Sequence, residues 1–467
     1  MIEMSRVWRG AGAVLLLAGV ALSGAGVAGA AEPTLDWTAC PSVAAFPGME
    51  SLQCAALEVP MDHAVSDGPT VQVALFKSPA RDPDRRKGSL IINRGGPGYP
   101  TSLYLMGLVT GSLPSPWDER VWQQYDVIAV DRRGVGFATP AVTCFDTVEA
   151  MTAFGADVPV VPLTAEDLAV RAVRDAEFAT RCRQRAGDLL DHLTTAAVAK
   201  DLDRVRAALG EDRLHFLGQS YGAALGLVYA NLYPDRVGSF VLDSVLDPTA
   251  SAPSGIRSEA TNGDLATTEA MNEALRLCAA GRTCAFAADD PVRAFPELLV
   301  RLRERPIPLT ASDGTSTTLT YSKLVAYLGG ALYQPAMWPQ IRPDLLLHLA
   351  YRAAGEPDSA PTEELARLVI DTTGALEVAR LLAGSRVLVH EGIGHIATQQ
   401  SRCAVTAVSD YLASGILPAE GATCPPDTIP SLDRGTSSCR VSQDGEVSPG
   451  IGVGVPGSCS VPEWTRG

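Results

Sequence analysis

A serine between two glycines is the residue of this chain best placed to act as a nucleophile. Gly218-Gln219-Ser220-Tyr221-Gly222 has the G-x-S-x-G spacing, which typically sets a reactive serine on a sharp turn between a strand and a helix. Such a turn is crowded, so the positions two residues before and after the serine must lack side chains. The apolar run LHFL precedes this motif and a helical pattern, Ala223–Leu232, follows it. We therefore predict that Ser220 attacks a carbonyl carbon.

Attack on a carbonyl creates an oxyanion, which two backbone N–H groups usually stabilise. The turn itself supplies one of them, the N–H of Tyr221. The second is expected from a loop after an earlier strand. Arg94-Gly95-Gly96-Pro97-Gly98 directly follows the apolar run Ser89–Asn93, and its glycines allow the backbone to approach a substrate closely. Gly95 or Gly96 is therefore the predicted second donor.

A serine nucleophile also needs a general base. Of the six histidines, His395 lies after the last strand-like run and C-terminal to Ser220, as the chain order Ser…Asp/Glu…His requires. We predict that His395 takes the serine proton and later returns it to the leaving group.

The third member of such a triad is a carboxylate that orients the imidazole. Asp371 closes the strand-like run Leu368–Asp371, the place expected for this acid, and is our preferred assignment. Asp243 and Asp247, which follow an earlier strand-like run, are alternatives.

The elements around these residues predict an α/β fold. Two β-rich stretches, Leu52–Val59 and Thr70–Lys77, flank a turn-rich segment and predict an opening hairpin. Short apolar runs then alternate with helical patterns. The runs are Ser89–Asn93, Asp126–Asp131, Leu214–Leu217 and Phe240–Asp243, and the helical patterns are Glu166–Arg185, Thr195–Leu209 and Ala223–Leu232. This alternation predicts a mostly parallel sheet covered by helices on both faces.

The rest of the chain predicts an insertion and a return to the core. Residues 248–361 are helical in pattern without clear strands and predict a lid, in which a carboxylate could bind a substrate amine; the candidates are Glu259, Glu269 and Glu273. The sheet is expected to resume at Leu368–Asp371 and Arg386–His390, with a helix at Ala375–Leu382 between them and another at Cys403–Leu412. The expected divisions are 1–30 (signal peptide), 31–247 (core), 248–361 (lid), 362–424 (core) and 425–467 (tail).

Composition narrows the class of protein. The formal net charge of −15 argues against nucleic acid or an anionic membrane as partner, because both require a basic surface. Arg6 and Arg9, the apolar run from Ala11 to about Val20 and the A-x-A site Ala28-Gly29-Ala30 predict a signal peptide that is too short to span a membrane. We expect a secreted monomer.

The ten cysteines predict disulfides rather than a metal site, because an exported chain is oxidised and no zinc-ligand spacing is present. Pairing sequence neighbours gives Cys40–Cys54, Cys144–Cys182, Cys278–Cys284, Cys403–Cys424 and Cys439–Cys459, although sequence alone leaves the connectivity open. No cofactor is expected.

Together these motifs resemble the secreted tripeptidyl-aminopeptidase and proline-iminopeptidase family of α/β hydrolases, of the actinobacterial type. The matching pieces are RGGPG at 94–98, DRRGVGFATP at 131–140, GQSYG at 218–222, LDSVLDP at 242–248 and the GIGH-to-Cys424 segment at 392–424. The resemblance covers roughly Trp37 to Cys424. It implies an α/β-hydrolase fold with a helical lid and the removal of short pieces from peptide N-termini, and it carries over to Ser220, His395 and the Gly95/Gly96 loop.

The chain departs from the family at the acid. The family presents this residue in an Asp-Pro-x-Thr-Pro motif, whereas Asp371 is followed by Thr372-Thr373-Gly374. Two other readings therefore stand beside the peptidase. One is a carboxylesterase, which uses the same residues on an easier leaving group. The other is a catalytically impaired protein of the same fold.

Overall fold

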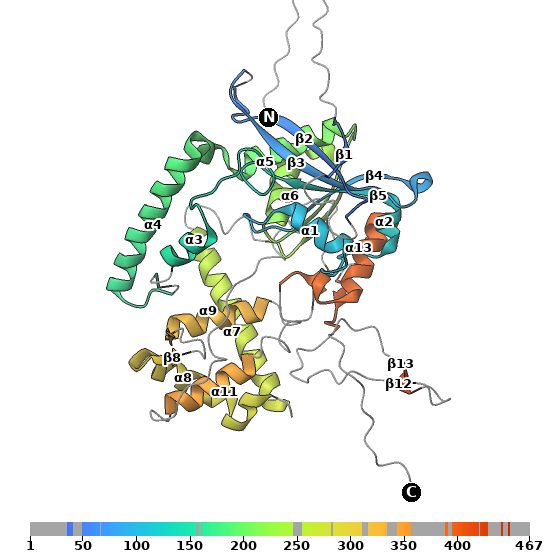
Figure 1. The fold of residues 1–467 in the computed structure, drawn as a ribbon. Helices are drawn as coiled ribbons and strands as arrows, with labels where there is room; N and C mark the ends of the chain where they lie inside the picture. Colours follow the sequence, from blue (N-terminus) through green and yellow to red (C-terminus); the bar gives the residue numbers. More distant parts are fainter. Residues whose placement is uncertain are drawn as a thin grey trace, which may run out of the picture.

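The computed structural model of the 467-residue chain describes most of the predicted core. The described residues are 35–40, 49–65, 67–155, 158–159, 161–245, 255–281, 284–310, 316–333, 343–355, 388–390, 395–419, 421–427, 440–441 and 447–448. Figure 1 shows a sheet with helices around it, and a helical insertion to one side. The predicted signal peptide and the predicted pair Cys439–Cys459 lie outside the described residues.

The core is a seven-stranded sheet in the order β1-β2-β3-β5-β4-β6-β7. Its strands are β1 Thr38–Ala39, β2 Gln53–Pro60, β3 Thr70–Ser78, β4 Gly88–Asn93, β5 Tyr125–Asp131, β6 Leu214–Gln219 and β7 Val237–Asp243. β2 and β3 form the predicted antiparallel hairpin, and β3 joins it to β5. The strands β5, β4, β6 and β7 are mutually parallel. The α/β prediction is confirmed, and the four predicted apolar runs Ser89–Asn93, Asp126–Asp131, Leu214–Leu217 and Phe240–Asp243 lie within β4, β5, β6 and β7.

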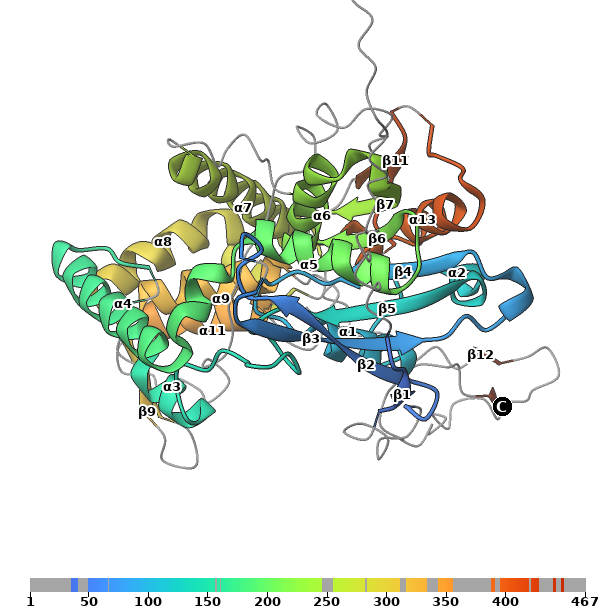
Figure 2. The same ribbon diagram turned by 90° about the horizontal axis from the view of Figure 1, so that it is seen from above.

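Both faces of the sheet are covered, which explains the unbroken apolar runs (Figure 2). Side chains alternate along β4: Leu90 and Ile92 pack on one face, and Ile91 packs on the other. The first face is covered by α1 (Thr101–Val109), α2 (Glu119–Gln124) and α13 (Arg402–Ser414). The second is covered by α5 (Thr195–Ala208) and α6 (Tyr221–Leu232).

Two further helices, α3 (Val148–Gly155) and α4 (Ala165–Ala186), lie beside the insertion in Figure 1. The start of α4 carries a capping box, in which the Thr164 hydroxyl accepts the Asp167 N–H and the Asp167 carboxylate accepts the Thr164 N–H. The segment before α4 contacts the insertion, because the Val161 N–H donates to Ser322 Oγ at 2.7 Å.

The insertion has a hydrophobic core of its own. It consists of α7 Gly255–Ala280, α8 Pro291–Glu304, β8 Ile307–Thr310, β9 Ser316–Leu319, α9 Tyr321–Tyr333 and α11 Pro343–Gly355. The expectation of no strands here was wrong, since β8 and β9 form an antiparallel hairpin that pairs Ile307 with Leu319. Both of these side chains are buried in the insertion core. Pro308 masked the pattern in the sequence, although a two-stranded edge tolerates proline.

The C-terminal part returns to the core through α13. The Asp118 N–H donates to Ser409 Oγ, and the Tyr125 hydroxyl donates to the Leu412 carbonyl, each at 2.9 Å. The expected resumption of the main sheet is not seen in the described part of this segment. There β10 (Val389–His390) pairs in parallel with β11 (Thr423–Cys424) instead. The predicted strand Leu368–Asp371 and helix Ala375–Leu382 lie outside the described residues. A short hairpin, β12 Arg440–Val441 with β13 Val447–Ser448, follows.

Four of the five predicted cysteine pairs form disulfides. They are Cys40–Cys54, Cys144–Cys182, Cys278–Cys284 and Cys403–Cys424. Disulfides are typical of proteins from oxidising compartments. Across the described ranges, no helix is both long and apolar enough to cross a bilayer.

Candidate active site

Four buried polar residues mark the carboxyl edge of the parallel strands. β4 ends at Asn93, β5 at Asp131, β6 at Gln219 and β7 at Asp243, and each side chain is at most 8% exposed. Burying polar groups costs free energy unless they are hydrogen-bonded. In open α/β sheets this edge is where ligands bind, so these side chains define where the candidate site lies.

Ser220 stands between β6 and α6 on a strained backbone. Its φ of 57° and ψ of −126° lie in a region that residues with a side chain rarely adopt. The Ser220 N–H donates to the Asp243 carbonyl at 2.9 Å, which ties the turn to the end of β7. A Cβ on Gly218 would lie 2.2 Å from the Gly222 carbonyl oxygen, and one on Gly222 would lie 2.3 Å from the Asn93 carbonyl oxygen. The two glycines are therefore sterically required, as the sequence pattern predicted.

The loop after β4 packs directly against this turn. A Cβ on Gly95, whose φ is +98°, would lie 2.5 Å from the Gln219 carbonyl oxygen and 2.9 Å from Ser220 Cβ. The Gly95 N–H donates to Asn93 Oδ1 at 3.0 Å, so it already has an acceptor. This contact favours Gly96 over Gly95 as the second oxyanion donor. The Tyr221 N–H lies in the first turn of α6, where N–H groups have no acceptor within the helix.

This close approach gives a steric prediction. Gly95→Ala is expected to lower the second-order rate of a serine-directed probe by about 10²-fold, because relieving the clash with the Gln219 carbonyl displaces the loop and misplaces the oxyanion donors by about 1 Å. It should also lower the melting temperature, since alanine at a positive φ is strained. Gly98→Ala in the same loop is the matched control, since its Cβ would meet nothing within 4 Å. Equal labelling rates in the two variants would contradict this packing argument.

His395 lies close to the same strand end. The residue after it, Ile396, has a φ of 69°, which is strained for a β-branched side chain. Its N–H donates to Ser244 Oγ at 2.7 Å, and the next N–H, that of Ala397, donates to Asp243 Oδ1 at 2.9 Å. These contacts, together with the Ser220 N–H bond to the Asp243 carbonyl, connect the segment after His395 to the turn that carries Ser220 through the end of β7.

The imidazole of His395 is 8% exposed. Burial lowers its pKa from 6.5 to about 4, because desolvation penalises the charged form. The Asp243 carboxylate acts in the opposite direction, and the Arg94 guanidinium adds to the lowering. The imidazole is therefore neutral at pH 7, the state that a general base requires.

Several residues of this site were missed by sequence reasoning. The Gln219 amide donates from Nε2 to Thr398 Oγ1 at 3.1 Å, and its Oε1 accepts from Arg94 Nη1 at 3.5 Å. Arg94 Nη2 also donates to Gln399 Oε1 at 3.2 Å, and its guanidinium lies over the Tyr104 ring. The sequence did offer one signal for two of them, since Gln219 directly precedes the predicted nucleophile Ser220 and Arg94 directly precedes the predicted oxyanion glycines. Their partners in 398–399 carry no motif.

The three acid candidates differ in what the structure describes. Asp371 and Asp247 lie outside the described residues. Asp243 is described, and its carboxylate accepts hydrogen bonds from the segment after His395. The assignment of Asp371 as the acid stays a prediction.

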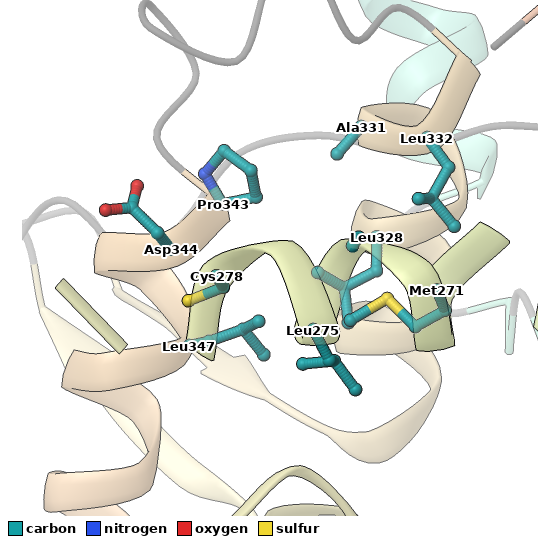
Figure 3. Close-up of a pocket in the computed structure, with 10 residues that line it drawn as sticks. Met271, Leu275, Cys278, Leu328, Ala331, Leu332, Pro343, Asp344 and Leu347 are labelled. Carbon is teal, nitrogen blue, oxygen red and sulfur yellow. The ribbon is translucent and has the colours of Figure 1, made fainter. Parts of the chain in front are cut away.

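Two of the three glutamates predicted to bind a substrate amine have described side chains. The Glu273 carboxylate is occupied by Arg276, whose Nε and Nη2 donate to it at 2.7 and 2.5 Å. Glu269 is exposed on α7, and the Glu259 side chain lies outside the described residues. A cavity of about 30 Å³ lies between α7, α9 and α11, with Met271, Leu275, Leu328 and Leu347 in its lining (Figure 3). Its lining is almost entirely apolar.

Two family descriptions match this sequence. The α/β hydrolase fold family matches residues 88–304, which include the strands that carry Ser220 and the Gly95/Gly96 loop. The TAP-like protein family matches residues 369–424, which include His395. The chain belongs to the TAP-like α/β hydrolases.

Curated relatives of this TAP-like α/β hydrolase include peptidases and an esterase. It is 32% identical to the serine protease Hip1 of Mycobacterium tuberculosis over 73% of this chain and 65% of that one. It is 39% identical to the tripeptidyl aminopeptidase of Streptomyces coelicolor over 47% of this chain and 39% of that one. Carboxylesterase B of Mycobacterium tuberculosis is 29% identical over 71% of this chain and 64% of that one. The chain thus spans less than two thirds of each of these relatives.

Proposed function

We propose that this TAP-like α/β hydrolase is an exported serine peptidase that releases short peptides from free N-termini through an acyl-enzyme. The observation that carries the proposal is the strained Ser220 between β6 and α6, with the Gly95 backbone packed against it. A strained nucleophile turn beside a glycine loop is the arrangement that acyl transfer requires.

In the proposed mechanism, Ser220 Oγ attacks the carbonyl carbon of the scissile bond while His395 accepts its proton. The N–H groups of Tyr221 and Gly96 donate to the oxyanion of the tetrahedral intermediate. The bond to the leaving amine then breaks, and His395 returns the proton to that amine. Water then takes the place of the amine. His395 accepts a proton from the water as it attacks the acyl carbon, and returns the proton to Ser220 Oγ as the acyl bond breaks. Asp371 is the proposed acid that orients the imidazole.

Two groups of observations support an exported peptidase over other classes. The relatives include a serine protease and a tripeptidyl aminopeptidase. The four disulfides and the predicted signal peptide favour the extracellular side of the membrane. We propose that the enzyme acts as a secreted monomer on peptides without a cofactor, and that a carboxylate of the insertion, such as Glu269, binds the free amine.

A carboxylesterase is the second candidate, because one relative carries that name. An ester needs the same nucleophile, base and oxyanion donors, and its leaving group departs more easily than an amine. The described geometry of Ser220 serves both reactions, so the substrate must be decided by assay.

Substrate choice is tested with matched chromogenic compounds. We expect tripeptide anilides with a free amine to be cleaved at least about tenfold faster than the same compounds with an acetylated amine, because a hydrogen bond between charged groups contributes roughly 1.5–3 kcal/mol. Simple p-nitrophenyl esters are the third class of substrate in the comparison. Preference for the acetylated anilides would refute the aminopeptidase proposal, and turnover of esters alone would support the esterase. If no substrate is cleaved and no probe reacts at Ser220, the catalytically impaired reading holds.

A further inference from the structure

The carboxylate of Asp243 is the centre of a buried network at the carboxyl edge of the sheet. Its Oδ1 accepts the Ala397 N–H at 2.9 Å, and its Oδ2 accepts the Thr398 N–H at 3.2 Å and the Thr398 hydroxyl at 2.6 Å. These donors belong to the two residues that begin the short 3-10 helix Ala397–Gln399, directly after His395 and Ile396. The Asp243 side chain is 8% exposed, and Thr398 is 5% exposed.

The same network reaches the nucleophile turn from the other side. The Asp243 carbonyl accepts the Ser220 N–H, so one residue contacts the backbone of the predicted nucleophile and the segment of the predicted base. Gln219, the residue before Ser220, donates its amide to the Thr398 hydroxyl, which in turn donates to Asp243. Ser244 adds a further contact, because its hydroxyl accepts the Ile396 N–H.

We propose that Asp243 and Thr398 are positioning residues, which hold the backbone after His395 and thereby set the place of the imidazole relative to Ser220. This inference rests on the proposed function and assigns these two residues a role separate from that of the acid proposed at Asp371. The strain at Ile396 supports it, because a β-branched residue with positive φ persists only where its surroundings fix the backbone.

The network predicts that two effects of Asp243 can be separated: its hydrogen bonds to the segment after His395, and its negative charge near the imidazole. Asp243→Asn removes the negative charge and replaces one carboxylate oxygen by an NH2 group, which cannot accept hydrogen bonds. Thr398→Val removes one hydroxyl and keeps the charge of Asp243. We expect Asp243→Asn to slow serine labelling by about 10²-fold, and Thr398→Val to slow it by about tenfold or more, since a hydrogen bond to a charged group is lost. Thr398→Ser keeps the hydroxyl and should react as the wild type does.

The pH dependence separates these variants further. Among the described residues, the charged groups that act on His395 are Asp243 at the end of β7 and Arg94 in the loop after β4. The Asp243 carboxylate raises the pKa of His395, so its loss should move the acid limb of the labelling rate to lower pH. Thr398→Val should leave that limb in place, because the carboxylate remains.

Asp131 supplies a matched control. It is fully buried at the end of β5, and its carboxylate accepts two backbone N–H groups, from Ser102 and Phe137, and the Ser102 hydroxyl. Asp131→Asn should therefore disturb folding in a similar way, while the acid limb of His395 stays in place. It resembles Asp243→Asn in burial and in the two backbone N–H groups that the carboxylate accepts, but it does not contact the His395 segment.

The test combines hydrogen exchange with fluorophosphonate labelling of the full chain. We expect Asp243→Asn and Thr398→Val to speed amide exchange in 396–399 by about tenfold or more, and Asp131→Asn to speed it near 102 and 137 instead. Unchanged exchange in 396–399 in Asp243→Asn would overturn the proposal. So would slow labelling in Asp243→Asn with wild-type labelling in Thr398→Val, which would indicate that Asp243 touches the imidazole directly. An unreactive wild type would refute the proposed function. The exchange rates of 396–399 would still show whether Asp243 and Thr398 hold that segment in place.

Discussion

Ser220→Ala is expected to reduce kcat/KM by about 10⁶-fold, because the serine and histidine of such a pair act as one unit and removing either loses nearly all of their joint effect. The fold should survive, since the Ser220 N–H keeps its bond to the Asp243 carbonyl and only a hydroxyl is lost. Steady-state kinetics on the best anilide or ester substrate measure the change, with the melting temperature as a check on folding.

The matched control for this variant is Ser409→Ala. Ser409 is fully buried in α13, where its hydroxyl accepts the Asp118 N–H and donates to the Val405 carbonyl. Its loss should cost about 1 kcal/mol of stability and leave turnover close to that of the wild type. Turnover by Ser220→Ala within tenfold of the wild type would show that the nucleophile lies elsewhere.

His395→Gln is expected to cost about as much as Ser220→Ala, again about 10⁶-fold in kcat/KM. The dependence of the wild-type rate on pH tests whether this loss reflects the role of His395 as a base. A base must be neutral to accept a proton, and burial lowers the pKa of His395 to about 4. The wild-type rate should therefore hold down to about pH 4 before it falls, well below the ordinary histidine value of 6.5.

Removal of another histidine supplies the control. His348 of α11 is hydrogen-bonded to Asp289 within the insertion, so His348→Gln should keep both the wild-type rate and the acid limb near pH 4. An acid limb near pH 6.5 in the wild type would contradict the burial argument. A residual rate in His395→Gln that still falls through pH 4 would assign that limb to another group.

The fold was largely predictable because its strongest signals are local. The parallel strands β4, β5 and β6 are buried on both faces, so their apolar runs can be recognised without knowledge of their partners. The glycines at 218 and 222 were predictable because steric exclusion acts over a few residues. The disulfides Cys278–Cys284 and Cys40–Cys54 close short loops of 6 and 14 residues, for which pairing of sequence neighbours is a good rule.

The long-range polar contacts of the site could not be predicted. Gln219 and Thr398 are 179 residues apart, and Asp243 lies 155 residues before Thr398. Glutamine, threonine and aspartate are common surface residues, and only the return of the chain to the carboxyl edge of the sheet brings them together. The β8–β9 hairpin was missed for a related reason, because its pairing depends on burial in the insertion core rather than on a regular alternating pattern.

The central claim is that Ser220 and His395 form one reaction centre with the N–H groups of Tyr221 and Gly96. The most direct measurement is a crystal structure of the protein after reaction with a fluorophosphonate. We predict a phosphorus bonded to Ser220 Oγ, an imidazole nitrogen of His395 within hydrogen-bonding distance of that oxygen, and the phosphoryl oxygen about 2.7–3.1 Å from both N–H groups. An adduct on another residue, or a phosphonylated Ser220 with His395 turned away from it, would contradict the account.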